Sequence, residues 1–307
     1  MKSSRSATTP DQRFVLYVPQ LEPLLREAVR VPPLVDALVR KCRPRPLDGQ
    51  SPQAELAAGL PLPAAPLTRR LDRPDDAGGV WLRADPVGLL PDLAAVWLQS
   101  DKRFEPGRWS SDLIELFGEE SLDLELTEHG RGYLRLESPP DAHFRPPWTL
   151  AGNSLEHCLP EGPDAGRWCR LLNETQVLLH QHRQVAEHPA TIPGSLWFWG
   201  GGELPKAGSA EPRVCRIVAD DPILAGLADW LGLPQINFQE DAVAQPGSLV
   251  EWPSRFEESA EVNLDRLQSF LRPLWRQLRL GRIRELELAG IETLRRFSVA
   301  DAWRIWR

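Results

Sequence analysis

Two arginines are the residues of this 307-residue chain best suited to chemistry, because their type favours anion binding. A guanidinium group grips a phosphate or carboxylate through two parallel hydrogen bonds. If the fold brings Arg83 and Arg131 together, they would form a small-anion pocket. Two alternatives stay open: Asp85 could pair with Arg83, and Arg131 could lie exposed in the turn of a hairpin.

Three consecutive glycines extend this hypothesis. They close the run Ser-Leu-Trp-Phe-Trp that begins at Ser195, which predicts a buried strand. Successive glycines let backbone N–H groups point at an anion, so Gly200 and Gly201 are further candidate ligand contacts. The alternative is a turn where another part of the chain packs closely. Glu203 follows instead of Gly-Lys-Ser/Thr, so this is not a Walker motif.

No residues with recognisable spacing predict a metal centre or a nucleophile. Transfer of a phosphoryl group between two metal ions needs clustered Asp and His ligands. All six histidines lie between His129 and His188, and His180 and His182 are two apart on a predicted helix, so they point to different sides. Gly-x-Ser-x-Gly and Cys-x-x-Cys are both absent from the sequence. We therefore expect no catalytic residue, metal or cofactor, and four reduced thiols.

Several blocks of the sequence together resemble a known family. They are Trp81–Val87, the stretch from Leu155 to Gly202 with its Leu-Pro-Glu-Gly-Pro-Asp segment, and the Trp-Arg ending. This combination resembles RpfE-type bacterial regulatory proteins and, more distantly, archaeal-type cofactor-independent phosphoglycerate mutases of the alkaline-phosphatase-like superfamily. The resemblance implies a cytoplasmic regulatory protein with a shortened alkaline-phosphatase-like α/β sandwich. It also places Arg83 at an arginine on the part of the mutases that holds substrate.

The same resemblance shows where this chain departs from the mutases. Their first strand runs into a metal-binding aspartate, whereas here Phe14–Val18 runs into Pro19-Gln20-Leu21. Their histidine ligands come mainly from the C-terminal part, but no histidine follows His188 in this chain. The resemblance therefore implies a related scaffold that has lost the metal centre.

The elements that would position these residues alternate between strands and helices, which predicts an α/β fold. The predicted strands are 13–19, which we expect to be central, 80–87, 94–100, 195–199 and 214–219, with hairpins at 122–126/132–136 and 284–288/292–297. The predicted helices are 22–31, 33–42, 52–58, 111–117, 164–182, 221–231, 263–280 with a kink at Pro273, and 299–306. We expect a core of residues 1–79 and 151–307 and an inserted small α+β subdomain at 80–150.

Composition limits the partners. The net charge of −7 and the pI near 5.5 argue against direct nucleic-acid binding. No signal-like apolar core and no run of 18 apolar residues occurs, so a cytoplasmic location without membrane insertion is expected. Residues 263–307 contain ten arginines against five acidic residues. Either these arginines are solvated on amphipathic helices whose tryptophans are buried, or this end of the chain faces an acidic partner.

The sequence thus predicts a non-catalytic regulatory or interaction protein related to phosphoglycerate mutase. It would sense a small anionic metabolite through Arg83, Arg131, Gly200 and Gly201, and would act on a protein partner that the sequence does not identify. One alternative is a metal-dependent phosphomutase or phosphatase built from unrecognised residues. Another is a partner subunit of a nucleic-acid enzyme that docks through the arginine-rich C-terminus.

Overall fold

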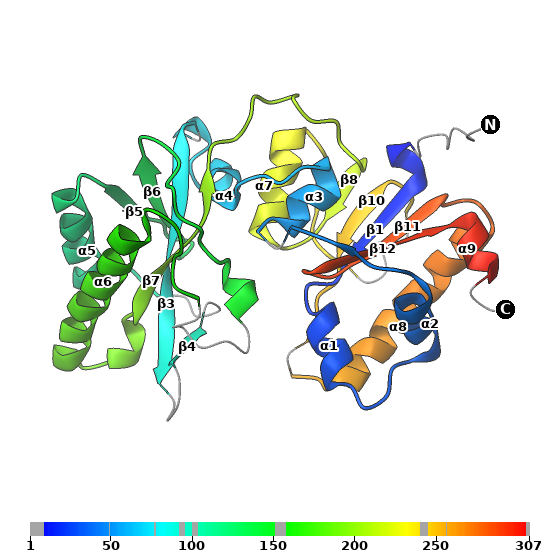
Figure 1. Ribbon diagram of the computed structural model, residues 1–307, viewed down its shortest axis with the longest axis horizontal. Coiled ribbons are helices and arrows are strands. Elements are labelled where there is room, and N and C mark those ends of the chain that lie inside the picture. The colour runs from blue at the N-terminus through cyan, green and yellow to red at the C-terminus, as the bar shows by residue number, and fades with distance from the viewer. Residues whose placement is uncertain are drawn as a thin grey trace. The chain divides into compact units, whose positions relative to one another are not determined.

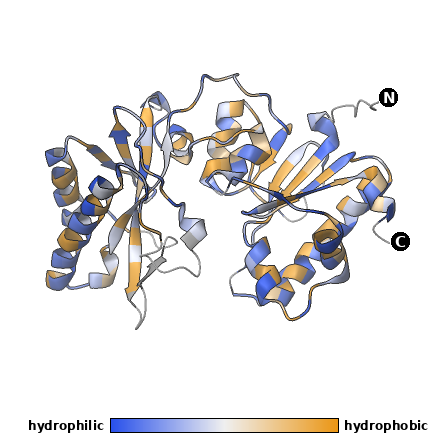
Figure 2. Cartoon of the chain, in the orientation of Figure 1, coloured by the Kyte–Doolittle hydropathy of each residue, from blue (hydrophilic) through white to orange (hydrophobic). Residues whose placement is uncertain are grey.

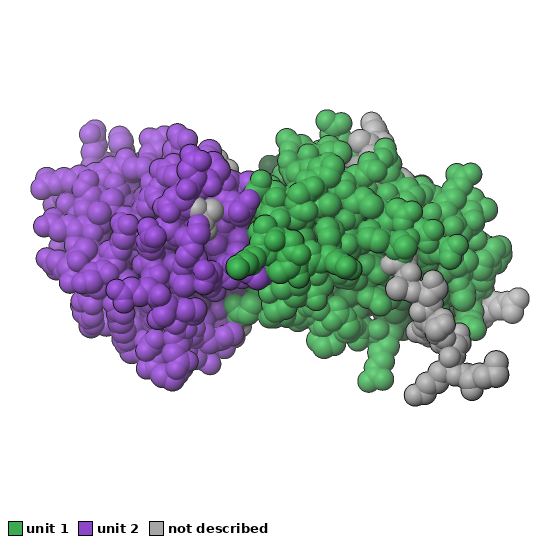
Figure 3. Space-filling view, turned by 90° about the horizontal axis from the view of Figure 1, so that it is seen from above, with its two compact units in different colours: residues 1–61, 206–307 green, residues 62–205 purple. Residues whose placement is uncertain are grey.

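The chain divides into two compact units, one inserted in the other. The computed structural model describes residues 9–48, 50–76, 78–91, 96–99, 104–150, 158–239, 245–255 and 257–304. Unit 1 comprises residues 1–61 and 206–307, and unit 2 comprises residues 62–205 (Figure 3). The insertion is therefore longer than the expected 80–150. It is longer because β7 (Ser195–Gly202) pairs with β3 (Val80–Pro91) and α4 (Ala64–Asp72) packs on both strands.

Unit 1 is built on a mostly parallel sheet. Its strand order, in the described part of the chain, is β2-β12-β11-β1-β10-β8-β9. The first strand pairs in parallel with β10 and β11, so the predicted central strand is confirmed. The strands are β1 (Arg13–Tyr17), β2 (Arg45–Pro46), β8 (Arg216–Val218), β9 (Gln235–Ile236), β10 (Ser248–Glu251), β11 (Glu285–Ala289) and β12 (Thr293–Ser298). The predicted closing hairpin is β11 and β12, which pair antiparallel.

Helices cover both faces of this sheet (Figure 1). The helices α1 (Leu21–Glu27), α2 (Pro33–Lys41), α8 (Ala260–Arg279) and α9 (Val299–Arg304) lie on one face, and α3 (Pro52–Ala58) and α7 (Pro222–Leu231) lie on the other. A short 3₁₀ turn, η1 (Pro10–Gln12), precedes β1. Side chains alternate along a strand, so Phe14, Leu16 and Val18 all point into the core against α8. The apolar stripe of α8 faces inward and its polar side outward (Figure 2).

Unit 2 packs helices on an antiparallel sheet. Its strands run in the order β4-β3-β6-β5, and β7 pairs with β3. The remaining strands are β4 (Val96–Gln99), β5 (Asp123–Leu126) and β6 (Gly132–Leu136), and the last two form the predicted hairpin. The helices α5 (Arg108–Glu119) and α6 (Ala165–Val185) pack on the sheet, with 3₁₀ turns η2 (Pro74–Asp76), η3 (Pro147–Leu150) and η5 (Pro189–Thr191). Phe198 of β7 makes edge-to-face contacts with Phe117 of α5, Trp168 of α6 and Phe144, and these contacts join both helices to the sheet.

Several details differ from the sequence-based expectations. The sequence did not predict α4, because Pro63 and Pro66 at its start resemble a loop, although proline is compatible with a first helical turn. The strand β7 runs through Gly202, so the glycines belong to the strand and do not follow it. The ends of the predicted strand 94–100 and helix 299–306 lie outside the described residues. No helix in the described ranges is both long and apolar enough to span a bilayer.

Candidate functional site

The parallel register of unit 1 brings the ends of three strands to one edge of the sheet. Tyr17 lies beside Glu251, and Val218 lies beside Val250, so β1, β10 and β8 end together. Ligands of open α/β sheets bind outside this carboxyl edge. Here the edge carries Pro19 and Gln20 after β1, Asp220 and Asp221 after β8, and Glu251 and Trp252 at the end of β10.

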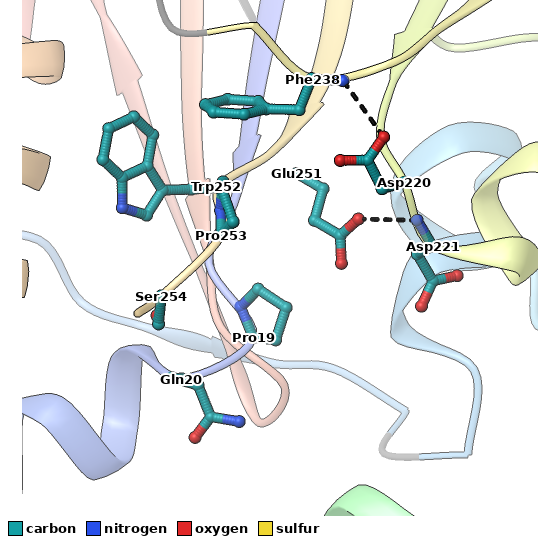
Figure 4. A pocket seen from close by; sticks show the side chains of 9 residues that line it. All are labelled: Pro19, Gln20, Asp220, Asp221, Phe238, Glu251, Trp252, Pro253 and Ser254. Atoms are coloured by element: carbon teal, nitrogen blue, oxygen red, sulfur yellow. Dashed lines mark hydrogen bonds between the residues drawn. The ribbon is translucent and has the colours of Figure 1, made fainter. Parts of the chain in front are cut away.

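A pocket of about 360 Å³ opens at this edge (Figure 4). Its walls combine acidic groups with two aromatic rings, Phe238 and Trp252, whose centroids are 5.6 Å apart. The full lining is Pro19, Gln20, Asp220, Asp221, Phe238, Glu251, Trp252, Pro253 and Ser254. We refer to it below as the edge pocket.

All three carboxylates of the described lining accept hydrogen bonds from backbone N–H groups. The Asp221 carboxylate accepts hydrogen bonds from the amides of Ile223 and Leu224, at 2.6 and 3.0 Å, and so caps the start of α7. The Asp220 carboxylate accepts one from the amide of Phe238 at 3.4 Å. In each of these contacts the accepting atom is Oδ1.

The third carboxylate, Glu251, is perturbed. Burial, followed by the negative charges of Asp221 and Asp220, raises the pKa of Glu251 to about 8. Its Oε2 accepts a hydrogen bond from the Asp221 amide at 3.1 Å. Burial and the charges of Asp221 and Glu251 also raise the pKa of Tyr17, which is the strand neighbour of Glu251. Both effects favour the protonated form of Glu251.

This donor set does not fit the metal centre of a two-metal phosphotransferase. Such a centre needs two clusters of ionised carboxylates and neutral histidines. Among the described residues, no histidine lines the edge pocket, and its first strand is followed by Pro19 and Gln20. Within the described residues, no group of three or more His, Cys, Asp and Glu side chains is placed to hold a metal ion.

Sequence reasoning missed Asp220 and Glu251. Each directly follows or ends a short apolar strand, Ile-Val-Ala before Asp220 and Leu-Val before Glu251. A carboxylate at the end of a parallel strand is a signal for a site at the sheet edge. That signal becomes usable only when β8 and β10 are known to be neighbours of β1.

Arg83, the first predicted anion ligand, is paired inside unit 2. It is 5% exposed, and its Nε and Nη2 donate to Asp85 Oδ1 at 2.9 and 2.8 Å. Its Nη1 donates to Thr68 Oγ1 at 3.0 Å. The Arg83–Asp85 pair that the sequence left open as the alternative is therefore present. An incoming anion would compete with Asp85 for this guanidinium group.

Arg131 is held in a similar way by Asp72. The Nε of Arg131 donates to Asp72 Oδ2 at 2.7 Å, and Nη2 donates to Oδ1. Tyr133 also donates its hydroxyl to Asp72, at 2.8 Å. Burial opposes ionisation of Asp72, but the hydrogen bonds from Arg131 and Tyr133 outweigh it and lower its pKa. The hairpin turn does not leave Arg131 free in solvent.

The structure does bring the two arginines near one another, around Tyr133. The Arg83 guanidinium lies 5.3 Å from the centre of the Tyr133 ring, and Arg131 reaches the hydroxyl of the same tyrosine through Asp72. Each positive charge has its own carboxylate, so the cluster is balanced. We call these five residues, Asp72, Arg83, Asp85, Arg131 and Tyr133, the paired-arginine cluster.

The glycines at the end of β7 are places of close packing. A Cβ added at Gly200 would lie 2.9 Å from the Cβ of Ala64 on α4, and one at Gly201 would lie 2.7 Å from a methyl of Leu82. Gly200 also has φ of +62°, a backbone angle that residues other than glycine rarely adopt. These contacts match the close-packing alternative for both glycines.

Comparison with known proteins gives the relationship of the chain. No family model matches the sequence. A 2,3-bisphosphoglycerate-independent phosphoglycerate mutase of Methanosarcina acetivorans is 25% identical over 211 residues, which is 62% of this chain and 50% of that protein. Another from Methanosarcina mazei is 28% identical over 179 residues, 52% of this chain and 44% of that protein. The chain is a distant homologue of these mutases.

The homology covers only part of the mutases. The chain aligns with half or less of each relative, and a probable mutase of this kind from Geobacter sulfurreducens, 34% identical over 100 residues, matches 31% of the chain and 25% of its own length.

The mixed α/β fold with two sheets agrees with the predicted fold class.

Two solved structures align with most of the chain at low sequence identity. A cofactor-independent phosphoglycerate mutase from Thermoplasma acidophilum aligns over 93% of the chain and 89% of its own, with 16% identity and a TM-score of 0.39. A Pyrococcus horikoshii protein aligns over 97% of the chain and 93% of its own, with 12% identity and a TM-score of 0.43. Similarity at this level assigns no role to any residue.

Proposed function

We propose that this chain is a non-catalytic regulatory or interaction protein that keeps a mutase-related scaffold without two-metal phosphoryl transfer. The observation that carries the proposal is the chemistry of the edge pocket, where Pro19 and Gln20 follow the first strand and no histidine is among the described lining residues. A metal pair that clamps the attacking and leaving oxygens needs ionised ligands at these places.

Electrostatics also oppose direct binding of a phosphorylated substrate at this edge. Asp220 and Asp221 line the edge pocket, and no Lys or Arg is among its lining residues. A phosphate group that entered it would meet like charges at short range, which is unfavourable unless cations intervene. The homology to mutases is therefore a relation of scaffold, and we assign no turnover to the chain.

Sensing of a small anion by the paired-arginine cluster remains a prediction. The contacts of Arg83 with Asp85 and of Arg131 with Asp72 disfavour it, since an anion would have to displace a buried carboxylate. The assignment to RpfE-type regulatory proteins and the cytoplasmic location are likewise proposals that rest on the sequence resemblance.

Metal content and turnover test the proposal together. Purified protein is analysed for bound metal and then assayed for phosphoglycerate mutase and phosphatase activity with added Mn²⁺ and Zn²⁺. We expect less than one metal ion per chain and no turnover above the blank. The same assays are run on Glu251→Gln and on the matched exposed variant Glu257→Gln.

The variant pair separates real activity from contamination. Metal-dependent turnover that is lost in Glu251→Gln and kept in Glu257→Gln would overturn the proposal and place catalysis at the edge pocket. Turnover that is equal in all three proteins would also overturn the proposal if it follows the chain through a second chromatographic step, and would indicate a contaminating enzyme if it does not. A pull-down with charge reversal at Arg272, Arg276 and Arg279 tests the alternative that the C-terminal arginines bind an acidic partner.

A further inference from the structure

Unit 1 contains a second pocket with the opposite electrostatic character. It measures about 350 Å³ and lies where α2 ends and where β12 leads into α9. Four of its lining residues are cationic and one is acidic: the lining is Lys41, Cys42, Arg43, Arg296, Phe297, Asp301 and Arg304. We call it the basic pocket.

The register of the sheet separates the basic pocket from the edge pocket. Ser298, the last residue of β12, lies opposite Glu285, the first residue of β11, and Glu285 lies beside Arg13, the first residue of β1. The basic pocket is therefore at the edge where the parallel strands begin. The edge pocket is where they end, so a ligand in one does not contact the other.

Among the described lining residues, Asp301 carries the single carboxylate, and this carboxylate is hydrogen-bonded within the chain. Asp301 Oδ2 accepts hydrogen bonds from the amide and the hydroxyl of Ser298, at 2.9 and 2.6 Å. The charge of Arg296 is partly neutralised by Glu287, because Arg296 Nη2 lies 2.8 Å from Glu287 Oε1. In the described ranges, no carboxylate lies within ion-pair distance of Arg43 or Arg304. The pocket therefore has an excess of positive charge.

Helix ends explain part of this charge. Lys41 and Arg304 lie in the last turns of α2 and α9, where a cation interacts favourably with the helix dipole. Arg43 lies beyond the cap residue of α2, and a helix end does not require a hollow of this size. The helix ends therefore do not account for a pocket that has both Arg43 and Arg304 in its wall.

We propose that the basic pocket binds a small polyanion that carries phosphate or several carboxylates. Guanidinium groups bind such oxygens in bidentate geometry, and Arg43 and Arg304 are the two lining arginines that form no ion pair with a carboxylate in the described part of the chain. The volume falls in the range of small-molecule sites and is too small for a folded segment of a macromolecule. The proposal is independent of whether the chain turns over a substrate.

Calorimetric titration tests the proposal on the full chain. Pyrophosphate is the phosphate probe and citrate is the carboxylate probe, at fixed ionic strength because salt screens these interactions. Arg43→Gln/Arg304→Gln removes two charges from the pocket. The control, Arg272→Gln/Arg282→Gln, removes two charges from exposed positions outside it. We expect the pocket variant to bind at least about tenfold more weakly and the control to bind like wild type.

Alkylation of Cys42 provides a second measurement that needs no variant. Cys42 lines the pocket and is partly exposed, whereas Cys215 is exposed and lies outside it. Bound probe should slow the alkylation of Cys42, followed by peptide mass spectrometry, and leave Cys215 unchanged. The proposal is overturned if neither probe binds, if both double variants bind equally, or if the two cysteines respond alike. A response to only one probe identifies the class of anion.

Discussion

Substituting Glu251 by glutamine tests the electrostatic description of the edge pocket. Glutamine has nearly the same shape and can still accept the hydrogen bond that the Asp221 amide donates to Glu251 at 3.1 Å. The substitution therefore removes the titrating proton with little change in packing. What it should alter is the dependence of stability on pH.

The sign follows from the raised pKa. In the unfolded chain the glutamate titrates near 4.5, and in the folded protein near 8, so the folded state holds the proton more tightly. The stability that this gives is complete below the unfolded pKa and is lost as the pH rises through the folded one. At 1.36 kcal/mol per pKa unit, the interval between the two values sets an upper bound of about 5 kcal/mol. Because Glu251 keeps some contact with solvent, we expect about 1–2 kcal/mol.

The assay measures unfolding by urea at pH 6, 7, 8 and 9 for wild type, Glu251→Gln and Glu257→Gln. Because two units can unfold separately, hydrogen exchange of β10 is followed as a reporter of unit 1 alone. Wild type and Glu257→Gln should lose stability between pH 6 and pH 9, and Glu251→Gln should lose about 1–2 kcal/mol less. Identical pH profiles for all three proteins would refute the raised pKa and the proposed protonation of this site.

Further predictions concern the packing and the buried charges. Asp85→Ala should lower the free energy of urea unfolding by about 3–5 kcal/mol, because it leaves Arg83 buried without a carboxylate. As a control, removing Asp36, the exposed partner of Arg40, should lower it by less than about 1 kcal/mol. Equal losses for the two variants would show that Arg83 is solvated. Gly200→Ala should destabilise unit 2 more than Gly232→Ala destabilises unit 1. Both glycines have positive φ, but of the two only Gly200 has a neighbour, Ala64, within 4 Å of an added Cβ. Thermal unfolding that ranks the two variants in the reverse order would contradict the close packing. Leu271→Ala in α8 should lower the free energy of unfolding by about 2–5 kcal/mol, because this side chain is fully buried, and a loss below 1 kcal/mol would place it outside the core.

The sequence predicted most elements of the fold because their signals are local. The apolar run before Pro19 gives β1, and Asp221-Pro222 with Gly232 marks both ends of α7, where Asp221 accepts two amide hydrogen bonds and Gly232 has φ of +67°. Alternating apolar residues on both sides of a glycine-containing turn give the β5–β6 hairpin. Each of these signals spans only a few residues.

The candidate site was harder to predict, because its parts are far apart in sequence. Glu251 becomes informative only when β10 is known to lie beside β1, and that pairing joins residues more than 200 positions apart. The paired-arginine cluster shows the same limit. The sequence could offer Asp85 as a partner of Arg83 two residues away, but Asp72, the partner of Arg131, lies on a helix that the sequence did not predict.

The central position of β1 has a consequence for synthesis of the chain. This strand leaves the ribosome before the strands with which it pairs, and Arg13 bonds to Glu285, which is synthesised 272 residues later. At about 5–20 residues per second, the delay is on the order of 10 to 50 seconds. Unit 2 is a continuous segment, so it can fold within that delay. The apolar side chains of Phe14 and Leu16 meanwhile lack the neighbouring strands β10 and β11, so the β1 segment stays exposed to aggregation until residues 248–289 have been synthesised.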